Sequence, residues 1–231
     1  MRDMESTVQR APIARLWAQA SHDLRQPVQA ALLVTRMLEA GPGRSGLSRT
    51  AHHIEAALES LQEMLEVLTL LSRIEAGLQM VALRACELTR VLDPTMREMA
   101  EIAAARGILL RQRNIRGLVR SNPRLLALAT RSLLLNAIKF ASGQSILACC
   151  NKRGGQLRFE AQFRGASLDA GNEANAFVQL APSANRPIAG ELGLGLSLLD
   201  YLCCRLGHRL HYAKLPRGGQ LLAMVLASPA R

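Results

Sequence analysis

Ala20-Ser21-His22-Asp23-Leu24-Arg25-Gln26-Pro27 places an imidazole beside a carboxylate inside an apolar pattern. The apolar residues, from Leu24 through Val28 to Leu38, recur at spacings of three and four, which predicts an amphipathic helix. His22 lies off this stripe, so we expect it to face solvent or a partner. A neutral imidazole held by a carboxylate is a nucleophile at neutral pH. From this octapeptide alone, however, a surface histidine with a chance acidic neighbour is the preferred interpretation.

A second helical pattern follows the glycine- and proline-rich breaker at residues 41–46 and ends near Gly77. Its apolar residues alternate steps of four and three, as in a coiled coil: Ile54, Leu58, Leu61, Leu65 and Leu68. Two helices with one apolar stripe each cannot close a core, so we expect the hairpin to pair with a second copy as a four-helix bundle. The alternative is that it packs on the C-terminal part of its own chain.

Beyond residue 80 the pattern changes to short strands and helices. Helices are expected at 90–105, with Val91, Met96, Met99, Ile102 and Ala103 inward, at 122–140 and at 194–206; strands are expected at 81–88, 108–111, 118–120, 145–150, 156–163, 209–214 and 220–226. Asn122-Pro123 is an N-cap followed by proline at the first helical position. The predicted fold class is therefore α+β, with a helical hairpin at 1–80 and an α/β sandwich of mixed sheet and helices at 81–231.

The composition is that of a globular chain. Of its 231 residues, 49% are hydrophobic and 20% charged. It has no apolar run of about 18 residues and no apolar N-terminal segment, so we expect a cytoplasmic protein without a membrane helix or signal peptide. Its five cysteines, in two adjacent pairs and one single position, lack the spacing of a zinc or redox motif. We expect them to be buried reduced thiols.

The net charge of +11 comes mainly from arginines scattered along the chain. Only 3% of the residues are aromatic and able to stack on bases. We interpret the charge as solvated surface with an attraction for ATP and acidic partner domains. Nucleic acid is an unlikely partner, and a DNA-associated regulator is the weakest of three functional interpretations.

Four motifs in order resemble those of bacterial sensor histidine kinases. Residues 21–27 resemble the H-box, and Leu71-Ser72-Arg73-Ile74-Glu75-Ala76-Gly77 resembles the end of the second dimerisation helix. Residues 133–140, Leu-Leu-Leu-Asn-Ala-Ile-Lys-Phe, resemble the N-box, and residues 193–197, Gly-Leu-Gly-Leu-Ser, resemble the second glycine box. The resemblance covers about residues 15 to 227, and the order of the motifs is more specific than any one of them.

The resemblance implies a sandwich of the histidine kinase ATPase type, and phosphoryl transfer from ATP to His22. Asp23 could orient His22 and take its proton. Arg25 could face a phosphate and Gln26 could position a water for dephosphorylating a partner, although both fit a solvated helix face equally well. The implied partners are a second copy of the chain, in a homodimer, and the receiver domain of a response regulator.

The expected nucleotide site lies in the second domain. Asn136 could bind Mg²⁺, Lys139 could balance phosphate charge, and Phe140 could line the adenine pocket. Gly193 and Gly195 could bring backbone N–H groups to phosphates, while Gly165 is what remains of the first glycine box. An amide on a helix surface and an ordinary loop-to-helix junction are the alternative interpretations of Asn136 and of the glycine pair.

Several positions depart from the family pattern in this pocket. Phe163 replaces the acid that accepts the adenine amino group's hydrogen bond, and Ser167 replaces a glycine. Ser132 stands where the N-box usually has Asn, and Glu191 where the second glycine box usually begins with Gly. We therefore expect weak or absent binding of ATP and Mg²⁺. Two functions remain: a histidine kinase with a divergent pocket, and a phosphotransferase or pseudokinase that relays phosphate between receiver domains without ATP.

Overall fold

The computed structural model describes Leu24, Val28 and residues 44–165, 195–216 and 219–228. These residues belong to two compact units, which divide after Met80. The first contains α2 (Arg44–Glu75), and every element from residue 81 onward belongs to the second. The second unit contains these elements: β1 (Arg84–Glu87), α3 (Leu88–Ala104), β2 (Leu109–Arg113), β3 (Leu118–Ser121), α4 (Pro123–Phe140), β4 (Ala141–Arg153), β5 (Gln156–Gly165), α6 (Gly195–Leu206), β6 (Arg209–Leu215) and β7 (Gly219–Val225).

Helix α2 confirms the second predicted helix, and Gly77 with φ of +70° follows its end. Glycine adopts this left-handed conformation without a steric penalty, which explains why the helix stops here. Its buried residues recur at helical spacing: Met64, Val67, Leu68, Leu71 and Ile74. Of the predicted seam, Leu68 is buried, whereas Leu58 and Leu65 are 55% and 54% exposed. The single chain therefore leaves an apolar stripe uncovered at a spacing of seven residues.

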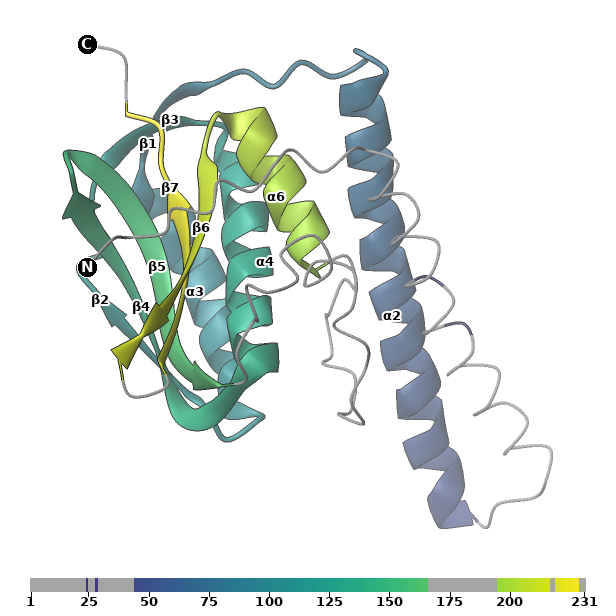
Figure 1. The fold of residues 1–231 in the computed structure, drawn as a ribbon. Coiled ribbons are helices and arrows are strands. Elements are labelled where there is room, and N and C mark those ends of the chain that lie inside the picture. The colour runs from purple at the N-terminus through teal and green to yellow at the C-terminus, as the bar shows by residue number, and fades with distance from the viewer. Residues whose placement is uncertain (1–23, 25–27, 29–43, 166–194, 217–218, 229–231) are drawn as a thin grey trace. The chain divides into compact units, whose positions relative to one another are not determined.

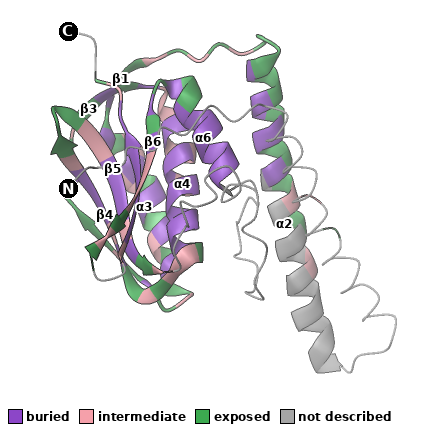
Figure 2. Ribbon diagram, viewed as in Figure 1, coloured by how far each residue is buried: buried purple, intermediate pink, exposed green. Residues whose placement is uncertain are grey.

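The second unit is a two-layer α/β sandwich, as predicted. Its five-stranded sheet has the order β2-β4-β5-β7-β6, with β2 parallel to β4 and the other pairs antiparallel. Helices α3, α4 and α6 lie together on one side of this sheet (Figure 1). Strands β1 and β3 form a separate antiparallel pair. Figure 2 shows that the buried residues of this unit are concentrated on α4, α6 and the central strands.

The central helix α4 begins as its sequence predicts. The Asn122 side chain accepts a hydrogen bond from the Leu125 N–H at 3.2 Å, and Pro123 is the first helical residue. Such a cap satisfies one of the otherwise unpaired amides of the first turn. Because α4 packs against α3, α6 and the sheet, it is apolar around most of its circumference.

Two of the predicted inward residues of α3 lie less deep than expected. Val91 and Ile102 are only half-buried, while Met96, Met99 and Ala103 are buried. The buried face also includes Leu88, Leu92 and Thr95. The helix begins two residues earlier than predicted, at Leu88, and its contact face is rotated accordingly.

A buried histidine joins the end of α6 to two other elements. The Nδ1 atom of His208 accepts a hydrogen bond from the Ala227 N–H, and its Nε2 atom lies 3.0 Å from the Ser121 hydroxyl. Because Nδ1 is the acceptor, the neutral ring carries its proton on Nε2. Burial lowers the pKa of His208 to about 4. This neutral ring therefore connects β3, the start of β6 and the segment after β7.

Candidate functional site

The predicted phosphoacceptor side lies outside the described residues. This applies to His22, Asp23, Arg25 and Gln26, and also to Gly193 of the second glycine box. Of the surrounding helix the structure describes only Leu24 and Val28, which are both helical. Gly195 is described and begins α6, as predicted.

The predicted metal ligand Asn136 lies in the second half of α4 and is 5% exposed. Its amide nitrogen donates to the backbone carbonyl of Ser132 at 2.7 Å. This hydrogen bond fixes the orientation of the amide and leaves the Oδ1 atom as the end that can bind a cation. Oxygen is the ligand that Mg²⁺ prefers, so the donor fits a metal even though Ser132 departs from the family pattern.

Lys139 and Phe140 follow on the last turn of the same helix. Lys139 is exposed and Phe140 half-buried. Both positions are compatible with contact to a ligand at the C-terminal end of α4. The structure thus brings three predicted site residues, Asn136, Lys139 and Phe140, to one helix end.

Gly165 lies directly against this helix end. It pairs with Ala141 across β4 and β5, and a Cβ atom at position 165 would collide with the carbonyl oxygen of Phe140. The Phe140 carbonyl carbon would be only 2.9 Å from that Cβ, closer than real Cβ atoms approach. Protein backbone, rather than open space, therefore faces Gly165 on this side, and packing alone is enough to require glycine here.

Phe163, which replaces the expected acid, is 4% exposed. It lies on the helix-facing side of β5, where its neighbours across the sheet are Ile146 on β4 and Gln220 on β7. Gln220 in turn pairs with Lys214 on β6. An aromatic ring and a buried amide thus occupy the layer in which the resemblance predicts a carboxylate.

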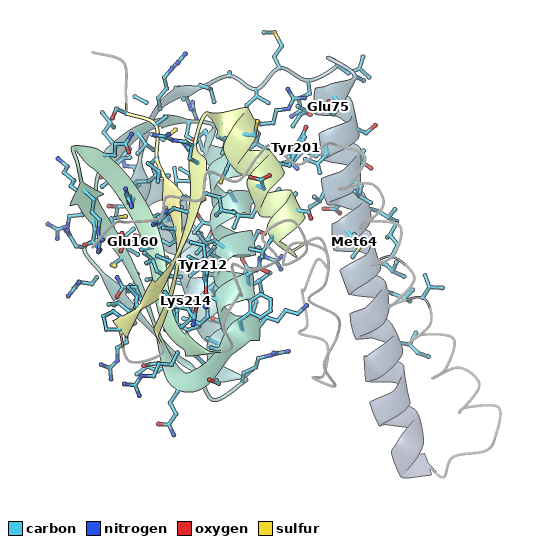
Figure 3. All side chains as sticks on the ribbon, viewed as in Figure 1. Met64, Glu75, Glu160, Tyr201, Tyr212 and Lys214 are labelled. Atoms are coloured by element: carbon cyan, nitrogen blue, oxygen red, sulfur yellow. The ribbon has the colours of Figure 1, made fainter. Side chains whose placement is uncertain are left out.

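Gln220 is held by a neighbouring side chain that sequence reasoning missed. The hydroxyl of Tyr212 donates to its Oε1 atom, which leaves the amide nitrogen as the free end of the group. Tyr212 and Lys214 are both labelled on β6 in Figure 3. Their side chains supply donors rather than a charged acceptor. Only the strand register reveals this arrangement, because the residues are more than 45 positions from Phe163 in sequence.

The cysteines largely follow the prediction. Cys86, Cys149, Cys150 and Cys203 are buried and reduced, whereas Cys204 is exposed, contrary to expectation, because it lies on the outward side of α6. Burial raises the pKa of Cys150 to about 12 and that of Cys203 further. Such thiols are unreactive at neutral pH. In the part of the chain that the structure describes, no group of His, Cys, Asp and Glu side chains could hold a metal ion.

None of the helices within the described ranges is long and apolar enough to cross a membrane.

Comparison with known proteins places the first unit in a family. Residues 13–77 match the His Kinase A (phospho-acceptor) domain. The matched range includes His22 and all of α2. A search of curated proteins finds no match at the threshold used.

Solved structures of the same fold include several histidine kinases. The histidine kinase AdeS of Acinetobacter baumannii is 12% identical, with 90% of this chain and 98% of that chain covered and a TM-score of 0.63. The mycobacterial sensor histidine kinase MprB is 17% identical over 64% of this chain and 99% of that one, with a TM-score of 0.52. Full-length ShkA in complex with AMPPNP is 17% identical, with a TM-score of 0.59; 96% of this chain but only 47% of that chain is covered.

At these identities the structural likeness establishes the fold, while the family match establishes the phosphoacceptor domain. Residues 13–77 are a His kinase A phosphoacceptor domain, and the chain that contains them has the fold of the cytoplasmic core of a two-component histidine kinase.

Proposed function

We propose that this chain is a two-component histidine kinase-like protein that carries a phosphoryl group on His22 and passes it to an aspartate of a receiver domain. The observation that carries the proposal is the phosphoacceptor match over residues 13–77, which contains His22 within the H-box-like sequence. We place the domain boundary near residue 80, so that the hairpin carries the histidine and residues 81–231 form the nucleotide-binding-like domain.

The proposed chemistry needs only one nucleophilic ring nitrogen in the hairpin. A nitrogen of His22 attacks the γ-phosphorus of ATP, a P–N bond forms, and the bond to the β-phosphate oxygen breaks to release ADP. Asp23 takes the ring proton. In the second step a receiver carboxylate attacks the same phosphorus and the P–N bond breaks. Arg25 and Gln26 are proposed to contact the phosphoryl group and a hydrolytic water.

We further propose that nucleotide use is weak. The Oδ1 atom of Asn136 is suited to Mg²⁺, and Lys139 to phosphate charge, whereas Phe163 offers no acceptor for the adenine amino group. Losing a charged acceptor costs about 1.5 to 3 kcal/mol, which corresponds to roughly ten- to a hundredfold in affinity. The packing of Gly165 against the Phe140 backbone means that its conservation as glycine needs no bound ligand.

The buried Phe163 favours a second candidate, a phosphotransferase that moves phosphate between receiver domains without ATP. In that case His22 accepts the phosphoryl group from one receiver and donates it to another, and the α/β domain acts as a docking surface. Both candidates require a homodimer of the hairpin, which the exposed Leu58 and Leu65 of the single chain support.

One titration separates the two candidates. A fluorescent ATP analogue is titrated with Mg²⁺, and incorporation of labelled phosphate is followed in parallel for the wild type and His22→Ala. Micromolar binding with label that depends on His22 would support the kinase. No binding at millimolar nucleotide, together with His22-dependent transfer from a phosphorylated receiver, would support the phosphotransferase.

A further inference from the structure

The face of the sheet opposite the helices carries a concentration of arginines. Strand alternation and register place six of them on this face, which we call the outer face: Arg111, Arg113, Arg153, Arg158, Arg164 and Arg209. Five are exposed and Arg158 is half-buried. Within the five described strands the only acidic residue is Glu160. The outer face is therefore strongly positive, with one carboxylate at its centre.

Glu160 is fully buried in the middle of this face, although it is ionisable (Figure 3). Its Oε2 atom accepts hydrogen bonds from the amides of Asn151 at 2.8 Å and Gln162 at 3.1 Å. Its Oε1 atom lies 3.9 Å from the Nε of Arg153. Cys149 is its neighbour on β4, and burial and the Glu160 charge raise the pKa of that thiol.

Two buried atoms at this centre have no hydrogen-bond partner among the described residues. They are the acceptor Oε1 of Glu160 and the donor Nε of Arg158. The two residues are two positions apart on β5, so their side chains point to the same side. Buried polar atoms are nearly always paired in folded proteins, so an unpaired acceptor beside an unpaired donor indicates a missing ligand group that has both functions.

A peptide group has both functions, because its N–H can donate to Glu160 and its C=O can accept from Arg158. The surrounding guanidinium groups select the side chains of such a peptide, since arginine binds carboxylates with two parallel hydrogen bonds. A nucleic-acid backbone would satisfy the arginines but offers no donor from its phosphates, and the buried carboxylate would repel it. The combination therefore favours an acidic polypeptide.

We propose that the outer face, centred on Glu160, binds an extended acidic segment of a partner protein. A strand-like segment advances about 3.3 Å per residue and the sheet strands are about 4.8 Å apart, so about six residues cross the face from β2 to β6. One peptide group pairs with Glu160 and Arg158, while acidic side chains on either side meet Arg111, Arg113 and Arg164. The long arginine side chains move aside to admit the segment.

The binding test uses a fluorescein-labelled peptide of about ten alternating Glu and Ser residues and measures anisotropy with the full-length chain at low salt. Replacing Arg111 and Arg113 by Ser should weaken binding about fivefold to tenfold, as expected for two exposed ion pairs. The control variant replaces Arg97 and Arg124, which are exposed on α3 and α4, and removes the same charge. No binding by the wild type, or equal loss in both variants, would overturn the proposal.

Glu160→Gln separates the proposed peptide contact from attraction by charge. The amides of Asn151 and Gln162 orient the new oxygen toward themselves, which places an NH₂ group where Oε1 was. This donor opposes the peptide N–H, so the affinity should fall about fivefold or more. If charge alone attracted the peptide, removing the negative charge would raise the affinity. A rise for the peptide, or tighter binding of a labelled DNA duplex than of the peptide, would overturn the assignment; circular dichroism confirms that the variant is folded.

Discussion

His208 should make the second unit sensitive to acid. Its pKa is about 4 in the folded chain and 6.5 in the unfolded reference. Between these values the unfolded chain binds a proton that the folded chain does not, so the stability falls as the pH decreases from about 6.5 towards 4. The full difference corresponds to about 3 kcal/mol, of which about 2 kcal/mol is lost by pH 5. The physical cause is that a charged ring would have to donate from Nδ1, where the Ala227 N–H already donates.

The assay is urea unfolding of the wild type and His208→Asn at several pH values between 7.5 and 4.5. Asparagine keeps an acceptor near the position of Nδ1 but does not titrate. We expect His208→Asn to be less stable at pH 7.5, because it loses the contact with Ser121. Its stability should fall less steeply with acid than that of the wild type, by about 2 kcal/mol between pH 7.5 and 5. Parallel pH profiles for the two proteins would refute this account of the buried ring.

Two further substitutions test the packing and the proposed assembly. Gly165→Ala should destabilise the second unit by about 1 to 3 kcal/mol, because the new methyl group meets backbone at the end of α4; Gly154→Asn, at an open turn position with φ of +55°, should be nearly neutral, and equal melting temperatures for the two would contradict this explanation. Replacing Leu58 and Leu65 by Glu should weaken the proposed dimer by at least about 2 kcal/mol, or roughly thirtyfold, in sedimentation equilibrium, because both residues are exposed in the single chain. The exposed Ser72→Glu is the control, and unchanged dimerisation of the double variant would refute the assignment of this stripe.

The elements that the sequence predicts well are those with local signals. Asn122 and Pro123 mark the start of α4, and the glycines at 154 and 155 both adopt positive φ in the hairpin between β4 and β5. These features depend on the conformational preferences of single residues. The strands were predicted too short, because the ends of β4 and β5 are polar where the sheet extends beyond the helices.

What the sequence alone could not reveal depends on strand register. The arginines appear scattered along the chain, yet alternation and pairing collect six of them on one face. In the same way, Gln220 becomes a neighbour of Phe163 only once β7 is paired with β5. Gly165 was predicted to serve a nucleotide, and its close approach to the Phe140 backbone is a contact that no local pattern encodes.

The central claim, that His22 carries phosphate, is tested most directly by phosphoryl transfer to the full-length chain. The wild type and His22→Gln are incubated separately with labelled ATP and Mg²⁺ and with a labelled phosphorylated receiver domain. We predict label in the wild type from at least one donor, stable to alkali and labile to acid as expected for phosphohistidine, and no label in His22→Gln. Label that persists in His22→Gln, or its absence from the wild type with both donors, would contradict the proposed function.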